Sequence, residues 1–175
     1  MINSGIMFFC ILIFSGSALA SHQGKGKVTV TGEVVEAACS IATDDIWQEI
    51  NFGHISLSEF AEGNMPASKT FTLHLMNCSL DKNDGGTWKN VNVTFDGKAQ
   101  ESHADMFAMT GDGQGIGILI SDENGHKAIP GQELPTTPLK NNHMDLNFNL
   151  QLSLNDDAIT PGNLSSFIRF MVAYQ

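Results

Sequence analysis

The chain has 175 residues, of which 42% are hydrophobic and 16% are charged, and it contains 17 glycines. This composition excludes a long coiled coil, a collagen and a fully disordered chain, and the length suits one domain. Nine basic residues against 19 acidic residues give a formal net charge of −10. Because a protein that binds phosphates needs a basic face, no nucleic-acid partner is expected.

The first twenty residues form a separate segment that contains no Asp, Glu, Lys or Arg. An apolar run over residues 6–14 is followed by Ala18-Leu19-Ala20, the small-x-small pattern of a signal-peptidase site. The run is short for a membrane span. We therefore expect residues 1–20 to be a cleaved secretory signal, with an N-terminal membrane anchor as the alternative.

Residues 24–32 alternate with a period of two, which is typical of a strand. Lysines and threonines form one face, and the other face is formed by Gly24, Gly26, Val28, Val30 and Gly32. A glycine-rich strand packs weakly in its own domain and can approach another backbone closely. This pattern indicates a strand that could be donated to another molecule, and the alternative is an ordinary first strand with a frayed start.

Cys39 and Cys78 are the two cysteines that follow the expected cleavage site. In an exported chain, an even pair of cysteines predicts one disulfide. Closing a loop of about 40 residues would stabilise the fold by about 4 kcal/mol. The alternatives are two free thiols or half of a metal site, but no cluster of His and Cys stands near either residue.

Five further segments alternate between apolar and polar residues, and they span residues 70–75, 90–95, 116–120, 146–154 and 167–174. The last of them places four residues on one face, namely Ile168, Phe170, Val172 and Tyr174. Only residues 56–61 suggest a short helical turn. Several short strands separated by Gly, Asn and Pro turns predict an all-β sandwich in one domain.

The motifs of enzymes and metal sites are not found. Six histidines stand singly, without the paired spacing of a zinc site, and residues 111–117 are glycine-rich but do not open a helix. Residues 81–86 lack the spacing of a calcium loop. Trp47 and Trp88 could mark a ligand surface, but packing in the core or at an edge is the preferred interpretation. We therefore expect no catalysis and no cofactor.

The segment from Gly26 to Ile41 resembles the start of mature pilins from bacterial chaperone–usher fimbriae, the type 1 and P pilus group. At the other end, Gly162 is the fourteenth residue from the C-terminus and Tyr174 is penultimate, which resembles the pilin C-terminal motif. Residues 50–53, 75–78 and 160–162 are also similar to pilin segments. The resemblance spans the whole mature chain.

This resemblance implies an incomplete immunoglobulin-like sandwich that lacks the seventh strand and is completed by a donated strand. Residues 21–32 would be the donor arm and residues 33–175 the pilin domain. A periplasmic chaperone would fill the open groove first, and the arm of a neighbouring pilin would replace it at the outer-membrane usher. The groove edge would include Gly162, Ile168, Phe170, Val172, Tyr174 and Gln175, with basic chaperone residues binding the carboxylate of Gln175.

The expected function is that of a structural subunit of an adhesive fimbria, exported through the periplasm to the cell surface. One position departs from many shaft pilins, because Gly24 stands where they carry a bulky apolar residue, which implies a slower donor or a different register. A minor adaptor or a terminating, anchoring pilin is therefore one alternative. A self-contained secreted β-sandwich that binds carbohydrate or protein directly is the alternative from another class. Tip adhesins with a second domain are about twice as long as this chain and are not expected.

Overall fold

The structure, a computed structural model, describes residues 26–32, 36–61 and 67–175. The chain divides into two units, Met1–Val34 and Val35–Gln175. In the first unit, residues 26–32 are exposed and have no strand assigned, although their pattern predicts one. The expected signal segment and Gly24 lie outside the described residues. In the described ranges, no helix has both the length and the apolar character to cross a membrane.

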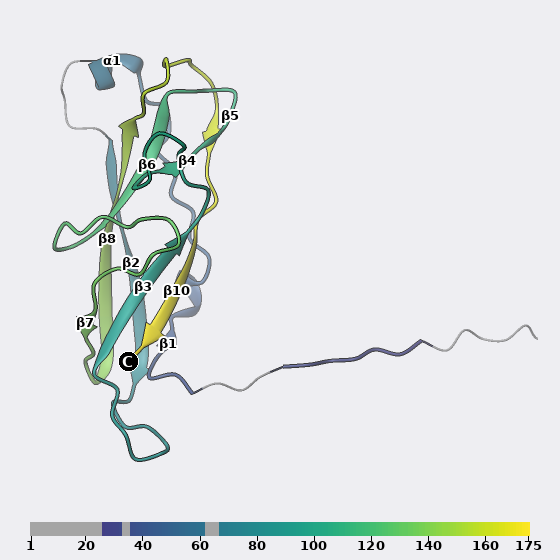
Figure 1. The fold of residues 1–175 in the computed structure, drawn as a ribbon, viewed down its shortest axis with the longest axis vertical. Helices are drawn as coiled ribbons and strands as arrows, with labels where there is room; N and C mark the ends of the chain where they lie inside the picture. Colours follow the sequence, from purple (N-terminus) through teal and green to yellow (C-terminus); the bar gives the residue numbers. More distant parts are fainter. Residues whose placement is uncertain (1–25, 33–35, 62–66) are drawn as a thin grey trace, which may run out of the picture. The chain divides into compact units, whose positions relative to one another are not determined.

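The second unit is built from antiparallel sheets (Figure 1). The largest sheet has five strands in the order β1 (Ser40–Ile41), β2 (Ser68–Cys78), β8 (Asn142–Leu154), β6 (Ile116–Asp122) and β4 (Phe107–Ala108). The second sheet has the order β10 (Arg169–Tyr174), β3 (Asn90–Asp96) and β7 (Thr137–Pro138). A short pair joins β5 (Thr110–Gly111) to β9 (Leu164–Ser165). The helical elements are the 3₁₀ turn η1 (Thr43–Asp45) and the helix α1 (Leu57–Ala61).

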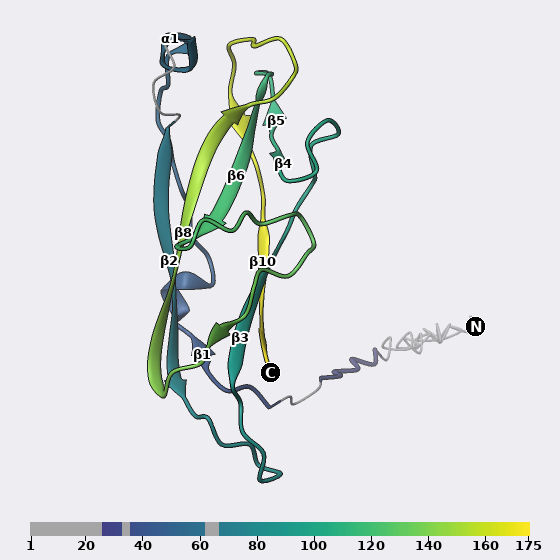
Figure 2. The same ribbon diagram turned by 60° about the vertical axis from the view of Figure 1, so that its left-hand side comes forward.

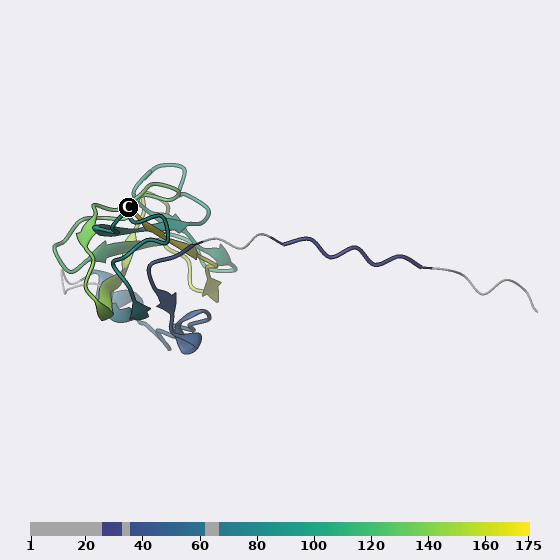
Figure 3. The ribbon, with the colours of Figure 1, turned by 90° about the horizontal axis from the view of Figure 1, so that it is seen from below.

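All five segments that alternate in the sequence contain a strand in the structure, although the last strand begins at Arg169 rather than at residue 167, and the all-β prediction is confirmed. They correspond to β2, β3, β6, β8 and β10, and the expected helical turn at residues 56–61 corresponds to α1. Figure 2 shows β8 between β2 and β6, and Figures 1 and 2 both show β10 beside β3. The Figure 3 view, turned by 90°, foreshortens the strands of this unit.

The core lies between the two larger sheets. On β8 the apolar residues from Met144 to Leu152 are buried and the polar residues between them are exposed or half-buried, whereas Leu154 at the end of the strand is exposed. Three rings from different strands join the sheets: Phe71 of β2, Phe95 of β3 and Phe148 of β8. The ring centroid of Phe148 lies 4.9 Å from that of Phe95 and 5.3 Å from that of Phe71. These contacts fix how the two sheets pack.

The predicted disulfide between Cys39 and Cys78 is confirmed. In β2 the buried side chains Leu73 and Leu75 alternate, so an unbroken pleat would turn Asn77 inward and Cys78 outward. A β-bulge between Met76 and Cys78 interrupts the register, and Asn77 adopts a φ of 52° there. The extra residue shifts the alternation by one position, and Cys78 is therefore buried and faces Cys39.

Candidate functional site

One edge of β10 has no partner strand within the described residues. β10 pairs with β3 from Arg169 to Tyr174, and it is the outermost strand of its three-stranded sheet. The side chains of Arg169, Met171 and Ala173 are exposed, whereas Phe170, Val172 and Tyr174 are half-buried. A free edge presents a row of unpaired backbone N–H and C=O groups, which can pair with another strand.

A groove of about 1090 Å³, here called the long groove, lies beside this edge. Residues 46–55 form one wall and residues 160–170 form the other. Its floor is apolar and comes from the five-stranded sheet: Phe71, Leu73, Ile118, Ile120, Leu150 and Leu152. Small-molecule pockets usually enclose about 300–1,000 Å³. The long groove exceeds that range and is lined by two long chain segments, so a peptide segment fits it better than a small molecule.

The first wall is anchored to β2 by side-chain hydrogen bonds. The carboxylate of Asp45, which is only 7% exposed, accepts hydrogen bonds from the backbone N–H of His74 at 2.6 Å and from Gln48 Nε2 at 3.3 Å. Its Oδ2 also lies 2.8 Å from His74 Nδ1. Gln48 Nε2 donates to the carbonyl of Thr72 at 2.9 Å. These bonds hold the segment after η1, including Trp47, along the edge of the sheet.

The second wall depends on a close approach of two backbone segments. A Cβ on Gly162 would overlap the backbone nitrogen of Gly113 and the carbonyl carbon of Asp112. Only glycine fits there, which is the physical reason for the glycine in the predicted C-terminal motif. Further along, Ser166 Oγ donates to the carbonyl of Ala108 at 2.9 Å. The wall is therefore held against β4 and β5.

Beyond one end of the groove, β10 meets the chain near the disulfide. Tyr174 Oη donates a hydrogen bond to the carbonyl of Cys39 at 3.3 Å, and its ring packs edge-on against Trp88. The terminal residue continues the pairing, because a main-chain oxygen of Gln175 accepts from the N–H groups of Lys89 at 2.6 Å and Asn90 at 3.0 Å. This end of β10 is therefore tied both to β3 and to the segment before β1.

The structure brings together part of the predicted site. Ile168 and Phe170 line the long groove, Gly162 lies in its wall, and Val172 and Tyr174 pack against the core at the end of the same strand. The remaining predicted edge residue, Gln175, is exposed. On the predicted donor face, Val28 and Val30 are 89% and 88% exposed, and Gly26 and Gly32 have no atom within 4 Å of an added Cβ. The donor role of this face stays a prediction.

Packing in the core or at an edge was the preferred interpretation for both tryptophans, and Trp47 does not follow it. Trp88 is half-buried against the core, as expected, but Trp47 is 76% exposed on the rim of the long groove. In the sequence, the exposed position of Trp47 is indicated only by its place between Ile46 and Ile50, in a segment without regular alternation. Neither wall of the groove is a regular strand over its whole length, and sequence periodicity alone did not identify them.

The chemistry of the long groove suits binding rather than catalysis. Among its lining residues, only Glu49, His54 and Arg169 ionise. Arg169 Nη2 is paired with Asp96 Oδ2 at 2.5 Å. No group of three or more His, Cys, Asp or Glu that could hold a metal ion occurs among the described residues. The dominant interaction available is burial of apolar side chains.

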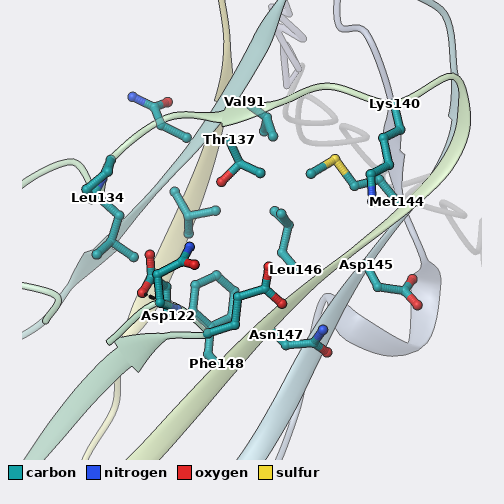
Figure 4. A pocket seen from close by; sticks show the side chains of 15 residues that line it. Val91, Asp122, Leu134, Thr137, Lys140, Met144, Asp145, Leu146, Asn147 and Phe148 are labelled. Carbon is teal, nitrogen blue, oxygen red and sulfur yellow. Dashed lines mark hydrogen bonds between the residues drawn. The ribbon is translucent and has the colours of Figure 1, made fainter. Parts of the chain in front are cut away.

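A second, smaller cavity of about 70 Å³ lies beside the part of β8 that precedes its pairing with β6 (Figure 4). Met144, Leu146 and Phe148 of β8 line it, together with Thr137 of β7. One buried polar atom of a lining residue, Oδ1 of Asn92, has no hydrogen-bond partner within the described part of the chain. The volume corresponds to about two water molecules, so the cavity is too small for most ligands.

Comparison with known proteins gives consistent matches. A family model described as "Fimbrial protein" matches residues 28–175. The PRS fimbrial minor pilin protein of Escherichia coli is 32% identical over 168 residues, which cover 91% of this chain and 86% of that protein. The Fimbria A protein of Serratia marcescens is 33% identical over 174 residues and 97% of both chains.

Two solved pilus structures have similar folds. The P pilus rod subunit PapA has a TM-score of 0.70 at 25% identity, covering 79% of this chain and 100% of that one. A chaperone–usher pilus, whose structure addresses rod uncoiling, also gives a TM-score of 0.70, at 27% identity, and covers 87% of this chain and 97% of its own.

Proposed function

The chain belongs to the fimbrial protein family, and from that premise we propose that strand exchange at the long groove joins it to its neighbours. It is a structural subunit of a fimbria of the chaperone–usher type and has an immunoglobulin-like fold. The observation that carries the proposal is the free edge of β10 beside an apolar groove of about 1090 Å³. A strand laid there would pair with β10 and cover the apolar floor.

The donor in this proposal is the arm, residues 21–32. Its inward face would be formed by Gly24, Gly26, Val28, Val30 and Gly32. Val28 and Val30 are almost fully exposed, and burying each of them would contribute about 1.5–3 kcal/mol. The three glycines bring little apolar area, so backbone pairing along β10 supplies much of the remaining attraction.

The proposed route requires two further partners. A free groove and strand edge would aggregate in water, so a periplasmic chaperone is expected to cover them until a neighbouring subunit arrives. Export by residues 1–20 would bring the chain to that chaperone, and an outer-membrane usher would then exchange chaperone for arm. The resulting polymer is the cell-surface fimbria. We assign the chain no catalytic role and no cofactor, because the groove offers apolar surface and strand pairing rather than reactive groups.

The test is a strand-exchange assay on the purified complex of this subunit with its chaperone. A synthetic peptide that covers a shaft-pilin donor arm is added, and native mass spectrometry follows chaperone release. Rapid replacement is expected if the groove is open and the subunit polymerises within a shaft or as an adaptor. A complex that keeps its chaperone in the presence of the peptide would instead assign the chain to the terminating end of the fimbria.

A second form of the experiment tests strand exchange itself. A chain without residues 21–32 that also carries Tyr174→Ala has lost the proposed donor and a contact at the end of β10. It should not be incorporated at internal positions of fimbriae assembled from wild-type subunits, because it has no arm to donate to a neighbour. Incorporation of this variant along the length of the fimbria, at the wild-type level, would overturn the proposal.

A further inference from the structure

Two large aromatic side chains, one from each wall of the long groove, are in contact with each other. Trp47 belongs to the wall of residues 46–55 and Phe167 to the wall of residues 160–170. Their ring centroids are 6.0 Å apart, with an angle of 43° between the planes. Trp47 is 76% exposed and Phe167 is 66% exposed. A single exposed apolar residue needs no explanation, but neighbouring ones at a groove mark an interaction surface.

The contact is between side chains, not between the walls themselves. In the described ranges, no backbone hydrogen bond joins residues 46–55 to residues 160–170. The wall that carries Trp47 is anchored to β2 by Asp45 and Gln48. The wall that carries Phe167 is anchored to the carbonyl of Ala108 in β4 by Ser166. The two rings therefore span a gap between fixed walls.

Phe167 lies two residues before β10, and its exposure indicates where its side chain lies. Ile168 and Phe170 pack against the core, whereas Phe167 is 66% exposed, so its side chain lies on the outer side of the wall. Trp47 is exposed on that same side, because the two rings are in contact. A strand placed in the groove would direct one set of side chains at the apolar floor and the other set at these rings.

The charges of the chain indicate which strand fits. The arm, residues 21–32, carries two charged residues, Lys25 and Lys27, and therefore a charge of +2. Residues 33–175 hold all the acidic residues and carry −12. With the valines of the arm turned inward, Lys25 and Lys27 turn outward, the direction in which Trp47 lies. An ammonium group over an indole ring is attracted by about 0.5–2 kcal/mol.

We propose that Trp47 and Phe167 form an aromatic clasp that closes over the donated strand and selects the arm of a second copy of this chain through its outward lysines. The inference rests on the proposed strand exchange, and it adds the residues that determine which donor is retained. A donor with small or acidic outward residues would meet the same groove floor but would make a weaker contact with the clasp.

The test measures how long the arm stays bound. The mature chain, residues 21–175, is refolded with an excess of a fluorescent synthetic peptide of residues 21–32. Release of the peptide is then followed after dilution into unlabelled peptide. Trp47→Ala and Phe167→Ala should each accelerate release by between about 2-fold and 30-fold. Trp47→Tyr keeps an aromatic ring and should restore most of the retention.

Two controls separate the clasp from general effects of exposed apolar residues and of charge. Met76→Ala removes an apolar side chain that is 42% exposed on β2 and neither lines the groove nor belongs to β10, so release should be unchanged. A peptide with Lys25→Ala and Lys27→Ala should leave the wild-type chain faster. From the Trp47→Ala chain, this peptide and the native peptide should be released at the same rate, because the partner ring of the lysines is already absent.

The outcomes distinguish the clasp from the strand exchange on which it rests. If the peptide binds and all the variants release it at the wild-type rate, the clasp is wrong and strand exchange stands. If the ring substitutions accelerate release but the two peptides behave alike on every chain, selection by lysine is wrong. If no peptide binds to the wild-type chain, both the clasp and the proposed exchange fail.

Discussion

At position 162 the fold leaves no room for a β-carbon. The backbone of the loop around Gly113 passes so close to Gly162 that any side chain would overlap it. Gly162→Ala should therefore destabilise the chain by about 1–3 kcal/mol, the usual cost of forcing extra volume into a packed site. Urea unfolding of the mature chain, completed by saturating donor peptide, measures this change.

The matched control is Gly32→Ala. An added Cβ at Gly32 has no atom within 4 Å, and its backbone needs no positive φ. The free energy of unfolding should stay within about 0.5 kcal/mol of wild type. Equal effects of the two substitutions would show that the close approach at Gly162 is not what the structure indicates.

Tyr174 gives a prediction about pH with a direct optical signal. Partial burial raises the pKa of Tyr174 above its ordinary value of 10.0, and its hydroxyl donates to the carbonyl of Cys39. Since Tyr174 is the only tyrosine in the chain, its ultraviolet titration reports this residue alone. The midpoint should lie above 10 in the folded chain and return to about 10 in urea.

The sign of the effect on stability follows from that shift. A raised pKa means that the folded chain holds its proton more tightly than the unfolded chain. The contribution of Tyr174 to stability is therefore complete below about pH 10 and is lost as the pH rises through the raised pKa. Tyr174→Phe cannot ionise and should lack this step. A step of the same size in the variant would contradict the assignment to Tyr174.

At the scale of the element, the five longer strands were predictable and the short ones were not. Alternation over five or more residues identifies a half-buried strand, and β2, β3, β6, β8 and β10 all have it. The strands β1, β4, β5, β7 and β9 contain two residues each, which is too short for a period to be visible. Their pairing depends on neighbours far away in the chain, such as Thr110 with Ser165.

The disulfide links one of these short strands to a long one. It joins Cys39, directly before β1, to Cys78 at the end of β2, over 39 positions. Its loss should lower the free energy of unfolding by about 4 kcal/mol, because the unfolded chain gains the freedom of an open loop. Denaturant unfolding with and without a thiol reductant measures the difference. A Cys39→Ala, Cys78→Ala chain should match the reduced wild type and should not respond to the reductant.

At the scale of the whole molecule, the sequence predicted the family but not the shape of its binding site. The family was accessible because the residues that resemble pilins are spread from Gly26 to Tyr174. The long groove was expected only through that resemblance, because it exists where a strand is missing and a missing strand leaves no pattern in the sequence. The place of Trp47 on the rim of the long groove depends on the contacts between Asp45 and His74, two residues that are 29 positions apart in the chain. No local signal encodes that distance.

The proposed donor and acceptor lie on different parts of one chain, so each contact between copies is heterologous and leaves a free donor and a free acceptor at the ends. Such contacts extend into linear polymers. A chain that lacks residues 21–32 keeps the acceptor and loses the donor, so it can receive one arm but cannot pass growth on. When it is mixed with wild-type mature chains, the mean polymer length should vary inversely with the fraction added, as measured on electron micrographs.

The control for this truncation is a chain that lacks only residues 21–23. It keeps the whole predicted donor face from Gly24 to Gly32, together with Lys25 and Lys27, and it should leave polymer length unchanged. If the longer deletion also leaves the length unchanged while entering the polymer, then growth continues through a surface other than the arm. If both deletions shorten the polymer equally, the register of the donor face begins before Gly24, and the inward and outward sets of the arm must be reassigned.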